Sequence, residues 1–142
     1  MRAQFFLLAT AVIIGFLYIA LKLQTSQSYA LAFANNFENE ITYIVDNFGL
    51  EYVGDYTQKF KNYLLQAGYN FTFVCWTNSE KITISECRSG NNKNCCYKYE
   101  KNKIITINIP GKNVVLYPVK EWICFYYNIS AKDEFVSKFF CT

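Results

Sequence analysis

The chain contains no histidine, and proline and glycine are scarce, with 2 and 6 among its 142 residues. Histidine is the residue most often used as a general base and as a metal ligand near neutral pH. Its absence excludes a Ser-His-Asp or Cys-His catalytic site and a Cys₂His₂ zinc site. The glycines are isolated from one another, so no glycine-rich phosphate loop is present. We therefore predict that the protein is not an enzyme and uses no cofactor or metal.

Charge is also modest, with a net value of +3, which by itself does not indicate a nucleic-acid-binding protein. With 52% hydrophobic and 19% aromatic residues, the chain is too apolar for a disordered protein. A mean hydropathy of +0.03 is that of an ordinary soluble domain. This average hides an uneven distribution, because the apolar residues gather at the N-terminus. The cysteines, in contrast, all lie later in the chain.

Acidic residues are absent before Glu38, and residues 5–21 read FFLLATAVIIGFLYIAL, with Thr10 as the one clearly polar side chain. At about 1.5 Å per residue this run spans about 26 Å, close to the minimum for crossing a bilayer. No polar face is present, although a surface helix of a soluble domain would have one. Residues 1–23 are therefore predicted to form a hydrophobic membrane helix, and Arg2 favours an inside N-terminus.

An amphipathic pattern follows, in which apolar residues recur with helical spacing over residues 24–50. We expect this segment to continue the first helix, giving one helix from Gln4 to Phe48 that ends at Gly49. A break near residues 24–27, which would give two helices, is the alternative. The apolar stripe consists of Ala30, Phe33, Ala34, Phe37, Ile41, Ile44, Val45 and Phe48.

Residues 51–142 are predicted to form a globular head. A short helix begins near the N-cap Asp55 and ends at Gly68. The apolar period then changes to two, which indicates strands over 69–76, 81–87, 95–99, 103–109, 114–119 and 121–127. We expect an antiparallel meander, with residues 100–102 as a hairpin turn and Pro118 marking an edge strand. Residues 131–140 fit a helix or a strand. The predicted fold class is α+β.

All six cysteines lie in the head, which suggests disulfides formed outside the cell. Six cysteines allow fifteen pairings. The favoured combination closes the loop 88–94 with one bridge, ties the C-terminal tail to a strand with a second, and joins the remaining two cysteines. A Cys₄ zinc site is the alternative, but it lacks a Cys-x₂-Cys pair. The favoured pairs are Cys87 with Cys95, Cys124 with Cys141, and Cys75 with Cys96. Asn70 and Asn128 each begin an N-glycosylation sequon.

The N-terminal sequence Met1-Arg2-Ala3-Gln4, followed by the apolar run, resembles an archaeal class III signal of the type IV pilin-like kind. In that family a basic residue and a Gly or Ala precede the cleavage point, and Gln often opens the mature chain. The resemblance makes Arg2 and Ala3 the recognition pair and Gln4 the first mature residue. The order of a long helix and a small antiparallel head is also similar to a pilin. Leu8 stands where many bacterial pilins carry a glutamate, which favours an archaeal-type filament.

The resemblance implies a structural subunit of an extracellular, archaeal type IV pilus-like filament. Such a chain is inserted in the membrane before assembly and then forms a helical homo-oligomer through its apolar helix, with the head facing solvent for adhesion. Ala9, Ala11, Gly15 and Ala20 would allow close helix approach. The residues expected to pack in the filament core are Phe5, Phe6, Leu7, Leu8, Val12, Ile13, Ile14, Phe16 and Leu17.

Other interpretations of the apolar run are a single-pass anchor that displays a small disulfide-bonded β domain, and a secretory signal removed near residues 30–34. Two surface features suggest a target on a cell surface. The basic loop 88–94, with lysines at 98, 101 and 103, would suit an anionic polymer, although we do not expect nucleic acid. The second feature is a set of tyrosines that could form an adhesive surface, with half-buried strand positions as the alternative interpretation. These tyrosines are Tyr97, Tyr99, Tyr117, Tyr126 and Tyr127.

Overall fold

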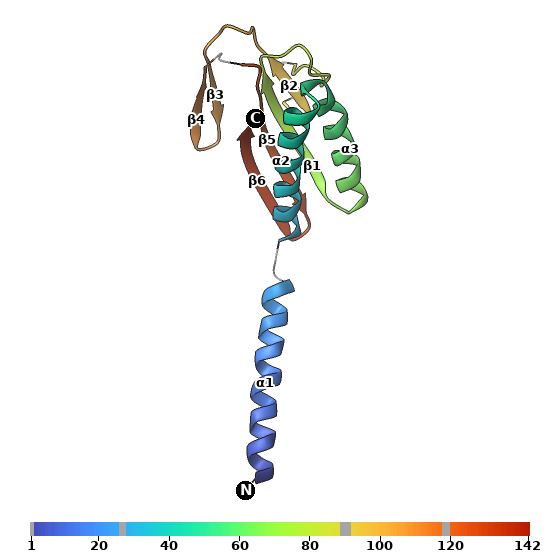
Figure 1. The fold of residues 1–142 in the computed structure, drawn as a ribbon, viewed down its shortest axis with the longest axis vertical. Coiled ribbons are helices and arrows are strands. Elements are labelled where there is room, and N and C mark those ends of the chain that lie inside the picture. Colours follow the sequence, from blue (N-terminus) through green and yellow to red (C-terminus); the bar gives the residue numbers. More distant parts are fainter. Residues whose placement is uncertain (1, 26–27, 89–91, 118–119) are drawn as a thin grey trace.

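The computed structural model of the protein describes residues 2–25, 28–88, 92–117 and 120–142, with residues 22–25 described by their backbone alone. Within these ranges the helices come first and the strands follow (Figure 1). The helices are α1 (Arg2–Thr25), α2 (Tyr29–Asn47), the 3-10 helix η1 (Leu50–Tyr52) and α3 (Val53–Gln66). The strands are β1 (Asn70–Thr77), β2 (Cys95–Lys98), β3 (Ile105–Ile109), β4 (Lys112–Leu116), β5 (Ile123–Ala131) and β6 (Glu134–Cys141). The predicted α+β class is confirmed.

The first helical region is two helices, so the expectation of one continuous helix from Gln4 to Phe48 is wrong. Helix α2 has its own N-cap, Ser28, whose backbone is extended (φ −63°, ψ 111°) and whose hydroxyl accepts from the Leu31 N–H. The carboxylate of Glu134 accepts from the next two N–H groups, those of Tyr29 and Ala30. A helix start whose donors are satisfied in this way no longer needs a preceding helical turn. Residues 26–27 lie outside the described part of the chain.

Helix α3 begins two residues before the predicted cap, so Asp55 lies inside the helix rather than at its start. The helix ends at Gln66 with Ala67 as its C-cap, and Gly68 follows, as expected for the stop, with a φ of +86° in the left-handed region that favours glycine. Gly54 brings α3 close to the segment after β1. A Cβ atom added at Gly54 would lie 2.6 Å from the Thr83 hydroxyl oxygen.

The main sheet has four strands in the order β2-β1-β5-β6, and it is mixed rather than purely antiparallel. Strand β2 pairs with β1 in parallel, whereas β1 with β5 and β5 with β6 are antiparallel. The expected hairpin through residues 100–102 does not form, since β2 and β3 belong to different sheets. Residues 131–140, which the sequence left ambiguous, contribute most of β6.

Residues 81–87 alternate in polarity but form no strand. Ile82 and Ile84 are buried in the larger core, and only the end of the segment pairs with β2. There the Cys96 N–H donates to the Ser85 carbonyl oxygen and the Cys87 N–H donates to the Cys96 carbonyl oxygen. The alternation therefore reflects burial against the core, and the pairing with β2 is too short to make a strand.

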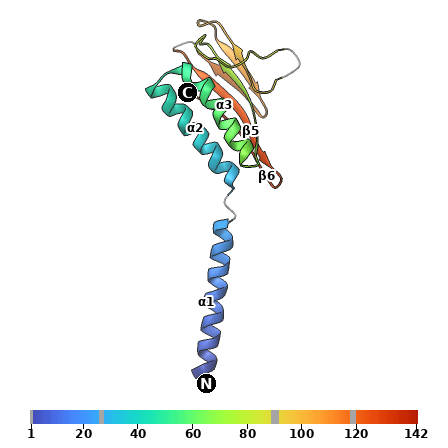
Figure 2. The same ribbon diagram turned by 90° about the vertical axis from the view of Figure 1, so that its right-hand side faces the viewer.

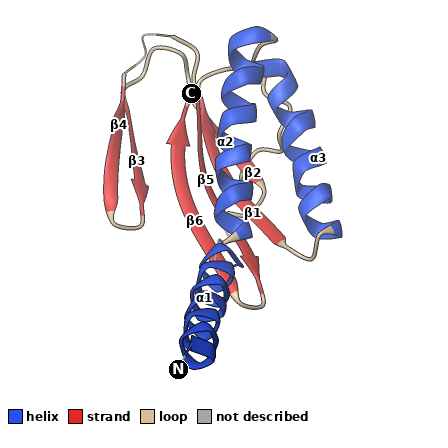
Figure 3. Ribbon diagram, turned by 60° about the horizontal axis from the view of Figure 1, so that its bottom comes forward, coloured by secondary structure: helices blue, strands red, loops and turns tan. Residues whose placement is uncertain are grey.

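Strands β3 and β4 form a separate hairpin, joined by the turn Pro110-Gly111. Figure 2 shows α2 and α3 on one side of the main sheet and the hairpin on the other, and Figure 3 shows the hairpin standing apart from β6. The head therefore has three layers. The hairpin side has its own core of Trp76, Ile105, Ile107, Trp122 and Cys124. The edge strand predicted over 114–119 corresponds to β4, whereas Pro118 lies outside the described residues.

The larger core lies between the helices and the sheet, and Phe37 of α2 stands at its centre. This side chain is completely buried, and its ring centroid lies 4.8 Å from that of Phe60 and 5.1 Å from that of Tyr127. The central part of the predicted stripe is thus buried, with Ala30, Ala34 and Ile41 also inaccessible to solvent, whereas Phe48 at its end is 59% exposed, because α2 stops at Asn47. Burial of this stripe fixes α2 on the sheet while α1 extends away (Figure 1).

Candidate membrane helix and disulfide-linked head

Helix α1 leaves its apolar side chains exposed over its described length. The nine side chains expected to pack in a filament core are 51–82% exposed, with Phe5 at the upper limit and Val12 at the lower. Thr10 hides its hydroxyl by donating to the Phe6 carbonyl oxygen, at 2.7 Å. Soluble domains rarely leave this much contiguous apolar surface exposed to water, because such a surface is normally covered. The exposed apolar surface of α1 is compatible with lipid or other apolar helices around it.

The segment Arg2–Leu21 has a mean hydropathy of 2.3 and the length needed to cross a membrane. The candidate processing residues Arg2, Ala3 and Gln4 lie in the first turn of α1 and are exposed. Nothing in the fold therefore buries them away from a membrane peptidase.

Small residues on α1 leave room for a neighbouring helix. A Cβ atom added at Gly15 would meet nothing within 4 Å, so no contact among the described residues explains a glycine there. Ala9, Ala11 and Ala20 are likewise exposed. Small residues in apolar helices allow two backbones to approach closely. This geometry suits helix–helix association, but an isolated helix in lipid does not require it.

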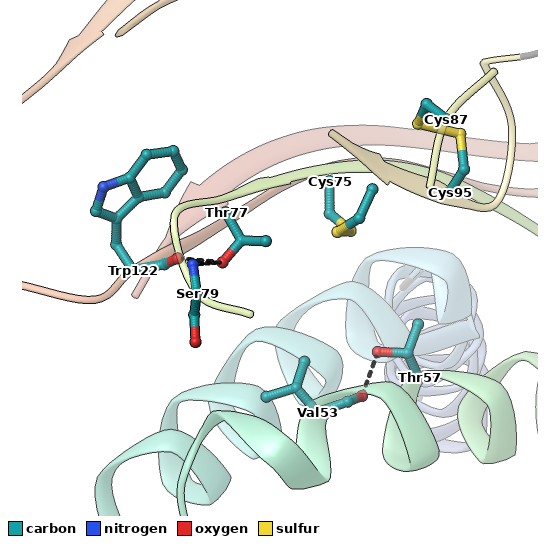
Figure 4. Close-up of a disulfide and its surroundings, with 9 residues drawn as sticks. Val53, Thr57, Cys75, Thr77, Ser79, Cys87, Cys95 and Trp122 are labelled. Atoms are coloured by element: carbon teal, nitrogen blue, oxygen red, sulfur yellow. Dashed lines mark hydrogen bonds between the residues drawn. A yellow bond between two sulfur atoms is a disulfide. The ribbon is translucent and has the colours of Figure 1, made fainter. Parts of the chain in front are cut away.

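The cysteines pair in the combination favoured from the sequence. Cys75 and Cys96 are register partners on β1 and β2, with Cα atoms 4.3 Å apart, and Cys124 and Cys141 are register partners on β5 and β6. The third bridge joins Cys87 to Cys95, the first residue of β2, across the loop that precedes this strand, as Figure 4 shows. The three bridges tie both edge strands of the main sheet and the preceding loop to the centre of the head.

A buried polar cluster closes the end of the head where β1 stops. The Thr77 hydroxyl donates to the Trp122 carbonyl oxygen at 2.7 Å, and the Ser79 N–H donates to the Thr77 hydroxyl oxygen at 3.0 Å (Figure 4). The Trp122 N–H donates to Asn78 Oδ1 at 2.9 Å. Sequence reasoning missed this cluster because its residues are separated by more than forty positions. It joins the loop after β1 to the start of β5.

Glu134 holds the lower end of α2 against the β5–β6 turn. Its carboxylate accepts from the N–H groups of Tyr29 and Ala30, both at 3.2 Å, and from the Tyr69 hydroxyl at 2.7 Å. The Tyr69 hydrogen bond, with help from the two backbone donors, holds the pKa of Glu134 below its usual value. The same hydrogen bond raises the pKa of Tyr69. These contacts position the first turn of α2, at the end of the head nearest α1 (Figure 1).

A second polar contact joins the middle of α2 to the sheet. The buried Tyr127 hydroxyl lies 2.8 Å from a carboxylate oxygen of Glu38 and 3.1 Å from the Ala34 carbonyl oxygen. Lys138 forms a 3.3 Å ion pair with the same carboxylate. Burial, and then the bond to Glu38, raise the pKa of Tyr127 well above its usual value. The contact holds α2 in one position along the sheet, since a shift of one turn would leave Tyr127 unsatisfied.

The two sequons lie opposite each other on neighbouring strands. Asn70 is the register partner of Ser130, and Thr72 is the partner of Asn128. Asn70 is exposed at the start of β1, whereas Asn128 is partly buried and its Oδ1 has no hydrogen-bond partner among the described residues. Asn70 is therefore the more accessible acceptor of the two.

The five candidate surface tyrosines do not gather in one exposed patch. Tyr127 is fully buried against α2, while Tyr97, Tyr99 and Tyr126 are half-buried beside the hairpin. Tyr117 is 64% exposed at the end of β4. In the basic loop, Arg88 and Lys93 are exposed, and residues 89–91 lie outside the described part of the chain.

Across the residues that the structure describes, no group of three or more Cys, Asp or Glu side chains is arranged to hold a metal ion. No protein-family model, curated protein or solved structure matches the chain.

Proposed function

We propose that the protein is a structural subunit of an extracellular, pilin-like filament, held in the membrane by α1 before assembly. The observation that carries the proposal is α1 itself, which is apolar on all sides and exposed along its described length. Such a helix is stable in a bilayer or in a bundle of its own copies, and a filament subunit uses both environments in turn. The resemblance of residues 1–4 to a class III signal favours the filament.

The head suits the same role. Three disulfides, a helix-side core and a hairpin-side core make it a stable unit that can face solvent outside the cell. A display domain on a single-pass anchor is the second candidate. The separation of α1 from α2 favours it, because a displayed domain needs no rigid helix connecting it to the membrane.

One substitution separates the two candidates. Gly15→Leu adds an apolar side chain at a position where a Cβ atom would lie more than 4 Å from the described residues beyond its own helical neighbours, so membrane insertion of α1 should be unchanged or improved. In a tight bundle of helices the same side chain blocks close approach. We therefore expect Gly15→Leu to leave the protein in the membrane and to abolish sheared, sedimentable filaments.

The matched control is Ile14→Leu, which conserves side-chain volume at the neighbouring position and should leave filaments intact. An anchored display protein would tolerate both substitutions equally, and the wild-type protein would stay in the detergent-soluble membrane fraction. The N-terminal residue of the mature protein adds a separate check, since class III processing predicts a chain that begins at Gln4.

A further inference from the structure

Opposite charge is divided between two segments of the head. Residues 23–58 contain five acidic residues and no lysine or arginine, whereas residues 101–120 contain four lysines and no acidic residue. The first segment includes α2 and the start of α3, and the second includes the hairpin β3–β4. Figure 2 places these elements on opposite sides of the main sheet.

The acidic side, which we call the helix face, carries exposed aromatic rings between its carboxylates. Tyr43, Phe48 and Tyr52 are 55–59% exposed, and their rings form a chain, with centroids 5.9 Å apart for the first pair and 6.3 Å for the second. Three exposed carboxylates, for which the structure shows no ion pair among the described residues, belong to the same face. They are Glu40, Asp46 and Glu51.

The basic side, which we call the hairpin face, has a matching composition. Ile104, Val115 and Tyr117 are 47–64% exposed. Ile104 is the residue just before β3, and Tyr117 is the residue just after β4. Four lysines belong to the same segment. Lys101 and Lys103 have ion-pair partners in Glu121 and Glu100. Lys112 and Lys120 are exposed with no ion pair shown in the described part of the chain, and the Lys112 ammonium, at the turn end of the hairpin, lies 5.3 Å from the centroid of the Phe139 ring.

We propose that the helix face of one copy docks on the hairpin face of the next, which makes the head–head contact of the filament. The inference rests on the proposed filament. Each face combines exposed apolar side chains with charged ones, as protein interfaces usually do, and the charged side chains of the two faces have opposite sign. Because the two faces differ and lie on opposite sides of the head, the contact is heterologous and leaves one face of each copy open for the next.

The two faces lie at similar distances from α1, which fits this arrangement. The hairpin and the C-terminal part of α2 both lie in the half of the head farther from α1 (Figure 1). Copies whose α1 helices run side by side therefore bring the two faces together with little displacement along the filament.

Charge reversal in the full-length chain tests the contact. Glu40→Lys with Asp46→Lys reverses the helix face, and Lys112→Glu with Lys120→Glu reverses the hairpin face. Each pair should reduce the yield of sedimentable filaments about tenfold or more, because like charges then meet across the contact. The variant with all four changes should recover filaments. Lys61→Glu with Lys132→Glu, the control, alters net charge as much as the hairpin pair and should have no effect.

A photoreactive phenylalanine analogue at position 115 gives a second measurement, which does not depend on filaments. It should cross-link to a peptide within residues 40–52 of another copy, in filaments or in membranes. Filaments that form normally from both reversed pairs would overturn the contact and leave the proposed function standing. If the wild-type chain forms no filaments, the proposed function fails, and absence of the cross-link in membranes overturns the contact as well.

Discussion

Phe37 is the side chain whose removal should most weaken the head. It is fully buried, and six rings surround it: those of Tyr56, Phe60, Phe71, Phe125, Tyr127 and Phe140, with centroids 4.8–6.3 Å away. Replacing a buried phenylalanine with alanine typically costs about 3–5 kcal/mol. Because these rings come from α3 and three strands, the site has little freedom to collapse, and we expect about 4 kcal/mol for Phe37→Ala.

The assay is urea unfolding of the full-length, disulfide-intact protein in detergent. With a slope of about 2 kcal/mol per M, the loss moves the unfolding midpoint by about 2 M. Far-ultraviolet circular dichroism follows the helices, while fluorescence follows Trp76 and Trp122, which lie in the hairpin-side core. Strands β1 and β5 contribute to both cores, so we expect the two signals to shift together.

The matched control is Phe48→Ala, which removes an aromatic ring that is 59% exposed and should change stability by less than about 0.5 kcal/mol. A loss of less than about 1 kcal/mol in the free energy of unfolding for Phe37→Ala would show that this side chain does not hold α2 on the sheet. A shift in circular dichroism alone would show that α2 unfolds separately from the sheet.

Three further predictions follow from polar contacts and disulfides in the head. Tyr127→Phe removes the hydroxyl that contacts Glu38 and should cost about 1–2 kcal/mol by the same unfolding assay, whereas Tyr117→Phe at an exposed site should cost nothing measurable. Burial, and then Glu40, raise the pKa of Tyr56 to about 12, and the pKa of Tyr127 is raised further, so both stay protonated in the folded head while unfolded tyrosines ionise near pH 10. Stability should therefore fall as pH rises from about 10 to 12, and tyrosinate absorbance that shows Tyr127 ionising with the exposed tyrosines would contradict this. Replacing Cys75 and Cys96 with serine opens a link across 21 positions and should cost about 3 kcal/mol, and six reactive thiols in the unreduced protein would disprove all three bridges.

Local patterns in the sequence predicted the elements that depend on local physics. The apolar run predicted α1, the stripe through Phe37 predicted the buried face of α2, and Gly68 indicated where α3 ends. The favoured disulfide pairing is the one observed, although the sequence left other pairings open. Adjacent Cys95 and Cys96 point to opposite faces of a strand, which argued only against a bridge between the two.

Long-range contacts decided the features that the sequence did not reveal. The start of α2 depends on Glu134, more than a hundred positions away, whose carboxylate satisfies the first N–H groups of that helix. The parallel pairing of β1 with β2 was missed because parallel neighbours usually have a helix between them, and the described residues between these strands contain none. For the candidate site, the apolar helix was evident from the sequence, but the division of opposite charges between two sides of the head required the fold.

The most direct test of the proposed function is electron cryo-microscopy of the fraction sheared from cells that produce the full-length chain. We predict helical filaments in which α1 helices pack around the axis and the disulfide-linked heads form the outer surface. Recovery of the protein only from the membrane, as a detergent-soluble monomer, would contradict it.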